Sequence, residues 1–426
     1  MDQPVKSHLS DLTGYDPMFC VYEGSSQNRG PGFIAWAMEV TMDHPTQVRL
    51  ANELLRLIDG HDTSQAESFA VNPVSTYTCP EHLAREQLRL FRSGPLLMGL
   101  SLELPGPGDY LTDDLSGVPI AIVRLADGSL SAFINVCRHR GARLLEGNGT
   151  LAGSMTCPYH GWLYDLHGRL KKLTPGDAFL GLDCAERNLT RLAVVEQHGL
   201  IWVSPSPAHP VEPVAPLGGL EQEIATYHFE DFVLYQRLQL HKSFNWKIVI
   251  ETFLENWHFP FVHRNTVLSI FLPSVSLFEA FGRHGRLIMP RRSILQMRDK
   301  PVEQWNLLEN SLVIYWLFPN TLLLWQRDHL ESWQVYPAQE CADRCTAQVS
   351  LYTPRAATSA RERAYWNKNM ALLIETVDGE DFAISERIQP GLRSGAQECL
   401  TFGRNEPALQ HFHRQIRLAL EDLPTG

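Results

Sequence analysis

Two short stretches, CRHRG at residues 137–141 and CPYHGW at residues 157–162, decide the fold of this 426-residue chain. Each stretch contains one cysteine and one histidine, and 17 residues lie between His139 and Cys157. Thiolates and imidazoles together can hold zinc or a two-iron, two-sulfur cluster. Structural zinc sites usually place both cysteines in one knuckle, whereas here each stretch supplies one residue of each kind. The pattern therefore favours the iron–sulfur cluster, and a structural zinc knuckle is the alternative.

The sequence around these pairs predicts a small all-β region. Short β-rich runs begin after Gly106, and in residues 118–136, VPIAIVRLADGSLSAFINV, the tripeptide Ala-Asp-Gly at 126–128 is typical of a hairpin turn. Residues 205–219 then contain five prolines, too many for a helix or a central strand. We predict a β domain over residues 91–204 and a proline-rich linker over residues 205–219.

The sequence before the β-rich region predicts two helices. Residues 44–60, HPTQVRLANELLRLIDG, place apolar side chains at helical spacing before Gly60, and residues 80–92 predict a second helix. We therefore expect an N-terminal extension of helices and loops over residues 1–90.

The chain after the linker mixes strands with a long helix. The apolar runs SLVIYWLF at 311–318 and TLLLWQ at 321–326 predict two strands, and residues 361–388 have the length and periodicity of a long helix. Residues 220–426 are thus predicted to form a second domain, and the whole chain belongs to the α+β class.

Composition excludes several classes of function. Hydrophobic residues make up 44% and charged residues 20%, values of an ordinary globular protein with a sizeable core. The net charge of -11 repels a phosphate backbone, so nucleic acid is not expected as a partner. The sequence has no 18-residue apolar run and no secretory signal, and its eight cysteines lack a disulfide-scaffold spacing. We expect a cytoplasmic protein with reduced thiols and no membrane contact.

A second candidate metal site lies in residues 245–263, NWKIVIETFLENWHFPFVH. His258 and His263 are five residues apart, so on an unbroken helix their side chains would diverge by about 140°. Pro260 is expected to end or kink the helix and let His263 return toward His258. By spacing alone, two core or surface histidines remain the alternative.

The two cysteine–histidine stretches resemble the Rieske motif of the aromatic-ring-hydroxylating oxygenase alpha subunits. The resemblance implies that Cys137 and Cys157 ligate the inner iron of a [2Fe-2S] cluster and that His139 and His160 ligate the outer iron.

The resemblance continues in the C-terminal half. The family follows its linker with an Asn-Trp-Lys segment and places an acid three residues before a histidine pair, which here is Glu255. Two histidines and a carboxylate form the facial triad of non-haem iron oxygenases. By resemblance to the family's Glu-Asp pair, the third ligand beside His258 and His263 would be Asp381. Glutamate at the position of Glu255, where aspartate is usual, also occurs in relatives that act on quaternary ammonium compounds such as carnitine.

The resemblance implies both a fold and a function. The expected fold is an all-β Rieske domain followed by a helix-grip (Bet v1-like) domain with an antiparallel sheet, assembled as a head-to-tail homotrimer. Glu255 would bridge the cluster of one subunit and the mononuclear iron of its neighbour. Dioxygen and two electrons would then hydroxylate a small organic substrate, by mono- or dioxygenation, or demethylate it oxidatively.

The electron source has to be a separate protein. The sequence contains no strand-to-helix G-x-G-x-x-G turn, so NAD(P)H would act through a separate reductase or ferredoxin. Two alternatives stay open: a Rieske electron-transfer or redox-sensing protein without oxygenase activity, and a zinc-stabilised binding domain.

Overall fold

The computed structural model describes residues 42–208 and 217–421. The predicted loops before residue 42 and most of the predicted linker, residues 209–216, lie outside the described residues. Among the described residues, no helix is both long and apolar enough to span a bilayer.

The region predicted to be all-β consists of three small antiparallel sheets. Five strands form the order β10-β5-β4-β3-β6, three form β11-β12-β2, and three form β7-β8-β9. The strands are β2 (Leu96–Leu100), β3 (Asp109–Asp113), β4 (Ile120–Arg124), β5 (Leu130–Ile134), β6 (Asn148–Thr150), β7 (Ser154–Thr156), β8 (Leu163–Asp165), β9 (Leu170–Lys172), β10 (Arg191–Leu192), β11 (Val194–Gln197) and β12 (Leu200–Val203). The predicted hairpin at residues 126–128 is confirmed, because it joins β4 to β5 with Gly128 at a φ of 85°.

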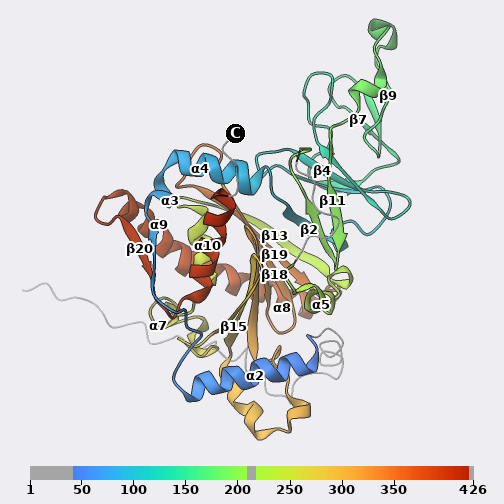
Figure 1. Ribbon diagram of the computed structural model, residues 1–426. Coiled ribbons are helices and arrows are strands. Elements are labelled where there is room, and N and C mark those ends of the chain that lie inside the picture. Colours follow the sequence, from blue (N-terminus) through green and yellow to red (C-terminus); the bar gives the residue numbers. More distant parts are fainter. Residues whose placement is uncertain (1–41, 209–216, 422–426) are drawn as a thin grey trace, which may run out of the picture. The chain divides into compact units, whose positions relative to one another are not determined.

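The C-terminal half is built on a seven-stranded antiparallel sheet in the order β13-β19-β18-β17-β16-β15-β14 (Figure 1). Its strands are β13 (Val233–Lys242), β14 (Leu277–Phe281), β15 (His284–Pro290), β16 (Ser311–Leu317), β17 (Thr321–Trp325), β18 (Leu330–Pro337) and β19 (Cys345–Thr353). Every residue of β16 and β17 is buried, which explains why the two strands appear in the sequence as unbroken apolar runs.

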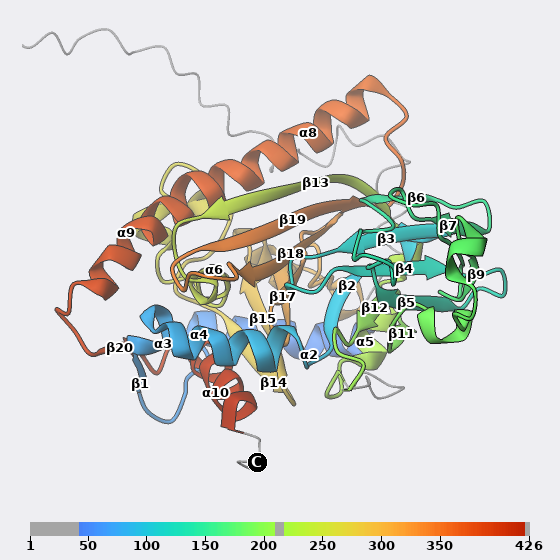
Figure 2. The ribbon, with the colours of Figure 1, turned by 90° about the horizontal axis from the view of Figure 1, so that it is seen from above.

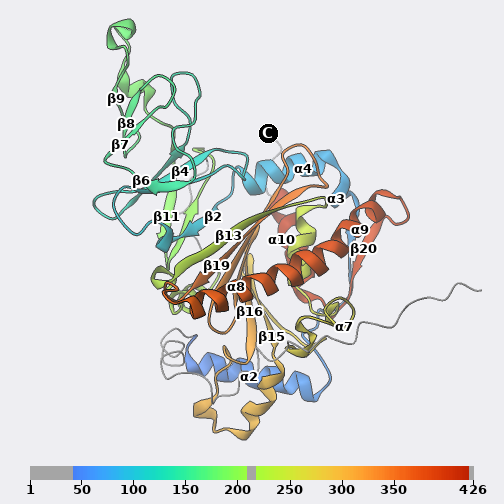
Figure 3. The ribbon, with the colours of Figure 1, turned by 180° about the vertical axis from the view of Figure 1, so that it is seen from behind.

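Helices cover both faces of this sheet. The helices are α2 (His44–Asp59), α3 (Ser75–Thr78), α4 (Pro80–Glu86), α5 (Glu221–Ala225), α6 (Trp246–Phe253), α7 (Phe259–Val262), α8 (Ala360–Ile374), α9 (Phe382–Arg393) and α10 (Pro407–Glu421). Side chains of α6, α8, α9 and α10 share one core with the sheet, and those of α2 share a second core on the opposite face. Figures 2 and 3 show α8 and α9 running across the first face. This α+β helix-grip arrangement confirms the predicted fold class.

The predicted long helix contains a turn that the sequence did not predict. Helices α8 and α9 are continuous, but residues Glu375–Asp381 between them form a π-helical turn. A π-helical turn also follows α4, at Gln87–Phe91. Such turns insert a residue without breaking the helix and are frequent at functional sites.

The expected role of Pro260 is wrong. Helix α6 already ends at Phe253, well before the proline. Pro260 instead lies in the first turn of the short helix α7, where its missing N–H costs no hydrogen bond. His258 and His263 therefore flank a single helical turn.

The N-terminal extension is built into the C-terminal half. Strand β1 (Ala70–Pro73) pairs antiparallel with β20 (Cys399–Phe402). The Tyr77 hydroxyl donates to Glu251 on α6 at 2.7 Å, and His413 on α10 contacts the same carboxylate oxygen at 2.9 Å. The domain boundaries predicted at residues 90, 204 and 219 stay predictions.

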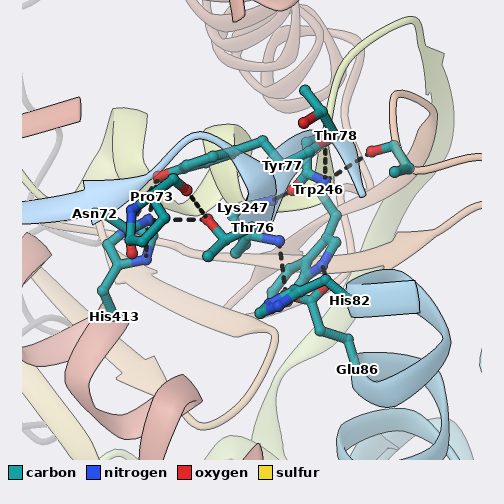
Figure 4. Close-up of polar contacts among 12 residues, drawn as sticks. Asn72, Pro73, Thr76, Tyr77, Thr78, His82, Glu86, Trp246, Lys247 and His413 are labelled. Atoms are coloured by element: carbon teal, nitrogen blue, oxygen red, sulfur yellow. Dashed lines mark hydrogen bonds and ion pairs between the residues drawn. The ribbon is translucent and has the colours of Figure 1, made fainter. Parts of the chain in front are cut away.

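A fully buried ion pair anchors the N-terminal segment to α6. The Lys247 ammonium lies 2.6 Å from Glu86, and neither side chain is exposed to solvent (Figure 4). Trp246 donates to the other oxygen of Glu86 at 2.9 Å, and His82 lies 3.2 Å from the first. Burial raises the pKa of Glu86, but Lys247 and His82 outweigh it, so the net shift is downward and the carboxylate stays charged.

We expect Glu86→Ala to destabilise the protein by about 3–5 kcal/mol, because it leaves the Lys247 ammonium buried without a counter-charge. Urea denaturation measures the change. The double variant Glu86→Leu/Lys247→Met, which removes both charges, should recover most of the loss. The control is Glu53→Gln, which removes one charge of an exposed pair. If Glu86→Ala were as stable as this control, the expectation would be wrong.

Candidate metal centres

The two cysteine–histidine stretches fold into loops with the same hydrogen-bond pattern. Cys137 N donates to Ala142 O at 2.8 Å, and Cys157 N donates to Trp162 O at the same distance. In each loop the glycine four residues after the cysteine has a positive φ, which only glycine adopts readily. The two turns thereby present their cysteines, each 2% exposed, and their histidines toward a common site.

In both loops the Nδ1 atom of the histidine has no hydrogen-bond partner among the residues that the structure describes, as expected of an atom that binds a metal. The rings of His139 and His160 lie 4.6 Å apart, and Trp162 stacks on His139 at 4.7 Å. Within the described part of the chain, both Nδ1 atoms are buried without a hydrogen-bond partner. Burial, together with the neighbouring His160 and Arg140, lowers the pKa of His139 and favours its neutral form. Two buried thiols and two free imidazole nitrogens fit a Rieske cluster.

A tyrosine that the sequence did not single out contacts the first loop. The Tyr164 hydroxyl on β8 accepts from Arg138 N at 3.1 Å and lies 3.5 Å from Cys137 Sγ. Burial raises the pKa of Tyr164, so the hydroxyl keeps its proton and can donate a hydrogen bond to the sulfur. No spacing in the sequence links Tyr164 to the cysteine 27 residues earlier.

The second predicted set also converges. His258 Nε2 and His263 Nε2 lie 3.1 Å apart, and Asp381 Oδ1 lies 3.4 Å from the first and 3.0 Å from the second. Among the described residues, these three form the group whose ligand atoms could hold a metal ion. Asp381 comes from the π-helical turn, 118 residues after His263 in the sequence.

A carboxylate orients each of the two histidines. Glu255 accepts from His258 Nδ1, and Glu380 accepts from His263 Nδ1 at 2.7 Å. A carboxylate can only accept, so both Nδ1 atoms donate, and in the neutral ring each Nε2 then presents a lone pair toward Asp381. Three acceptor atoms then converge on one point, and Asp381 Oδ1 has no hydrogen-bond partner among the described residues. Such a set fits a cation.

The pKa values of Asp381 and His263 are both shifted upward. Burial raises the pKa of Asp381, with a net shift upward in spite of His263 and His258. Burial lowers the pKa of His263, but hydrogen bonds and charges from Asp381 and Glu380 outweigh it, so the net shift is upward.

Sequence reasoning missed the roles of two neighbours of this site. Glu380 was only one of several acids on the predicted helix, and Thr266, which donates to Glu380 at 2.6 Å, carried no signal. The other acids of that helix lie elsewhere: Asp378 pairs with Lys242, and Glu386 is exposed.

Comparisons with known proteins agree with this geometry. A family model described as "Ring hydroxylating alpha subunit (catalytic domain)" matches residues 229–422, and one described as "Rieske [2Fe-2S] domain" matches residues 95–183. Together the two models match more than half of the chain. The match to a catalytic domain supports the oxygenase interpretation over a Rieske electron carrier.

Individual curated proteins are similar to this chain over different lengths. The carnitine monooxygenase oxygenase subunit of Escherichia coli (strain K12) is 24% identical over 84% of this chain and 97% of its own length. The glycine betaine monooxygenase oxygenase subunit of Chromohalobacter salexigens is 34% identical over 44% of this chain and 41% of its own length.

A solved structure shows the same fold. It is the structure of a quaternary ammonium Rieske monooxygenase that concerns carnitine oxidation and inter-subunit electron transfer, and it matches 87% of this chain and 97% of its own with a TM-score of 0.70 and 20% identity. The chain is thus an oxidoreductase with a Rieske [2Fe-2S] domain and a domain for a mononuclear iron, and it belongs to the Rieske non-haem iron oxygenase alpha subunits.

Proposed function

We propose that this chain is the terminal oxygenase component that hydroxylates or oxidatively demethylates a small quaternary ammonium compound. The observation that carries the proposal is the convergence of His258, His263 and Asp381 on one buried point. Bound there, Fe(II) would supply the chemistry of dioxygen activation, because a facial triad leaves coordination positions open.

The chain's own residues prepare the site. Glu255 and Glu380 hold the two imidazoles in the tautomer that a metal ligand needs. The Phe259 ring lies 5.0 Å from the rings of both histidines and belongs to the apolar core, and apolar walls exclude water from the reacting groups.

Electrons would reach the iron from the cluster of a neighbouring subunit in a homotrimer, supplied by a separate NAD(P)H-dependent reductase or ferredoxin. Exposed apolar side chains support such an interface. Near the cluster loops, Tyr159 is 56% and Leu180 is 88% exposed, and near Glu255, Phe261 is 72% and Trp257 is 37% exposed. Clusters of solvent-exposed apolar side chains are typical of protein interfaces.

Charge complementarity supports the same pairing. Arg138 and Arg140 flank His139 and are exposed or partly exposed. On the other side, Glu255 and Glu406, whose charges interact, are partly exposed. A basic loop on one subunit would therefore meet acidic residues on the next. The cytoplasmic location inferred from the sequence stays a prediction.

The relatives' names and one buried carboxylate support the substrate class. Glu331 on β18 is 3% exposed; its Oε1 lies 3.5 Å from His329 Nε2, whereas its Oε2 has no hydrogen-bond partner within the described residues. Trp333, two residues along the strand and so on the same face, lies 6.0 Å from Phe382, the residue after Asp381. A buried carboxylate with a free oxygen near aromatic rings suits a quaternary ammonium group.

Metal analysis tests the function. Anaerobically purified protein should contain about three irons and two sulfides per chain, one iron more than a Rieske cluster alone. His263→Ala should lose about one iron, keep the EPR signal of the reduced cluster and lose substrate oxidation with a supplied reductase. If His263→Ala still oxidised the substrate at the wild-type rate, the oxygenase site would be misassigned.

The substrate class has its own test. Glu331→Gln should lower kcat/KM for a quaternary ammonium substrate at least about tenfold, because a desolvated cation loses a favourable charge interaction of ~1.4 kcal/mol or more. Glu386→Gln, the same change at an exposed position, should leave kcat/KM unchanged. An equal loss on a neutral substrate analogue would assign Glu331 a structural role instead.

The cluster gives a third prediction. Tyr164→Phe removes the hydroxyl beside Cys137 Sγ and should lower the reduction potential by an amount on the order of tens of millivolts, since one hydrogen bond contributes about 1 kcal/mol. Protein-film voltammetry measures the shift. An unchanged potential would show that the hydroxyl does not donate to the cluster.

A further inference from the structure

We infer that Glu380 is a positioning residue of the mononuclear site, which fixes the ring and the tautomer of His263 and thereby governs how tightly the metal is held. The inference rests on the proposed assignment of His263 as a ligand. It adds a residue that takes no part in ligation, and it concerns metal retention rather than the reaction itself.

The first argument is that His263 is held at both ring nitrogens. Its Nδ1 donates to Glu380 Oε2 at 2.7 Å, and its Nε2 lies 3.0 Å from Asp381 Oδ1. A neutral imidazole has one proton, and the carboxylate of Glu380 requires that proton on Nδ1. The opposite tautomer would turn the Nδ1 lone pair toward a carboxylate and block Nε2 with a proton. Glu380 thus selects the form that can bind a metal.

The second argument is that Glu380 is itself fixed. Its Oε2 also accepts from the Thr266 hydroxyl at 2.6 Å, and Thr266 follows His263 by three residues on the same loop. The loop therefore contacts the carboxylate twice. Because Glu380 has two partners, its carboxylate keeps its position when the metal leaves. The imidazole of His263 therefore stays oriented toward the metal position.

The third argument comes from the π-helical turn. Consecutive side chains on a helix point about 100° apart. Here Glu380 and Asp381 reach opposite nitrogens of the His263 ring. Asp381 is on the inner side, with its side chain 5% exposed, and Glu380 is nearer the surface at 22%. One helical segment therefore delivers both the carboxylate ligand and the residue that orients its neighbour.

Glu255 provides the contrast. It accepts from His258 Nδ1 in the same way, but it lies in the loop between α6 and α7, where the Trp257 and His258 amides donate to it. Glu255 thus orients His258 from the loop that carries Trp257, whereas Glu380 orients His263 from the helical segment that carries Asp381. The two side chains are similarly exposed, at 15% and 22%, so what distinguishes Glu380 is the segment that holds it and its second partner, Thr266.

The test measures metal affinity directly. Protein with an intact cluster and a depleted mononuclear site is titrated with Co(II), and the visible absorption of the bound ion gives the dissociation constant. Glu380→Gln keeps an oxygen acceptor but loses the charge, and should weaken binding about tenfold. Glu380→Leu removes the acceptor and should weaken it about a hundredfold. Thr266→Val should weaken it less, in the same direction.

The controls separate this inference from simpler explanations. Glu386→Gln should bind Co(II) as the wild type does, and every variant should keep the EPR signal of the reduced cluster. Wild-type affinity in both Glu380→Leu and Thr266→Val would overturn the inference. If Glu380→Leu does not fold, Thr266→Val alone decides, because it leaves the carboxylate in place. If His263→Ala also keeps wild-type affinity, the proposed metal site itself fails, which is a different result.

Discussion

A buried carboxylate oxygen without a hydrogen-bond donor is the constraint on which the second half of this chain depends. Asp381 Oδ1 lies beside two imidazole nitrogens whose protons are on their far sides. Burying an anion in this way is costly unless a cation compensates it. The surrounding elements keep the arrangement in place: α7 spaces the two histidines by one turn, and the long helix on the sheet holds the aspartate against them. A divalent ion balances this set of groups better than any side chain of the described residues does.

The two metal centres use different kinds of local structure. The cluster loops are short, have the same hydrogen bonds and lie within 24 residues of sequence, from Cys137 to His160. Their geometry is set by tight turns with glycine at positive φ. The mononuclear site instead joins a one-turn helix to a distant helix, so its geometry depends on packing across the sheet. The first site is defined by its loops and the second by the whole domain.

This difference explains what could be predicted from the sequence. The cysteine–histidine pairs, the hairpin at residues 126–128 and the buried strands β16 and β17 are local patterns, and each was predictable. His258 and His263 were predicted to approach each other, but for a wrong reason, because Pro260 begins a helix and does not end one. A π-helical turn has no distinctive composition, so the sequence indicated neither the turn nor the contact from Glu380 to His263. The pairing of β1 with β20 joins segments more than 300 residues apart and leaves no periodic signal.

That pairing has a consequence for how the protein is made. Helix α6 contacts Tyr77 and His413 through one carboxylate, and β20 and α10 are synthesised more than 300 residues after β1. Domains fold as units from the N-terminus during synthesis, and contacts between distant segments form late. The cluster loops can therefore adopt their final structure while the ribosome is still translating the second half. The proposed iron site can form only after Asp381, 118 residues after His263, has been synthesised, so the residues of the two centres become available at different stages of translation.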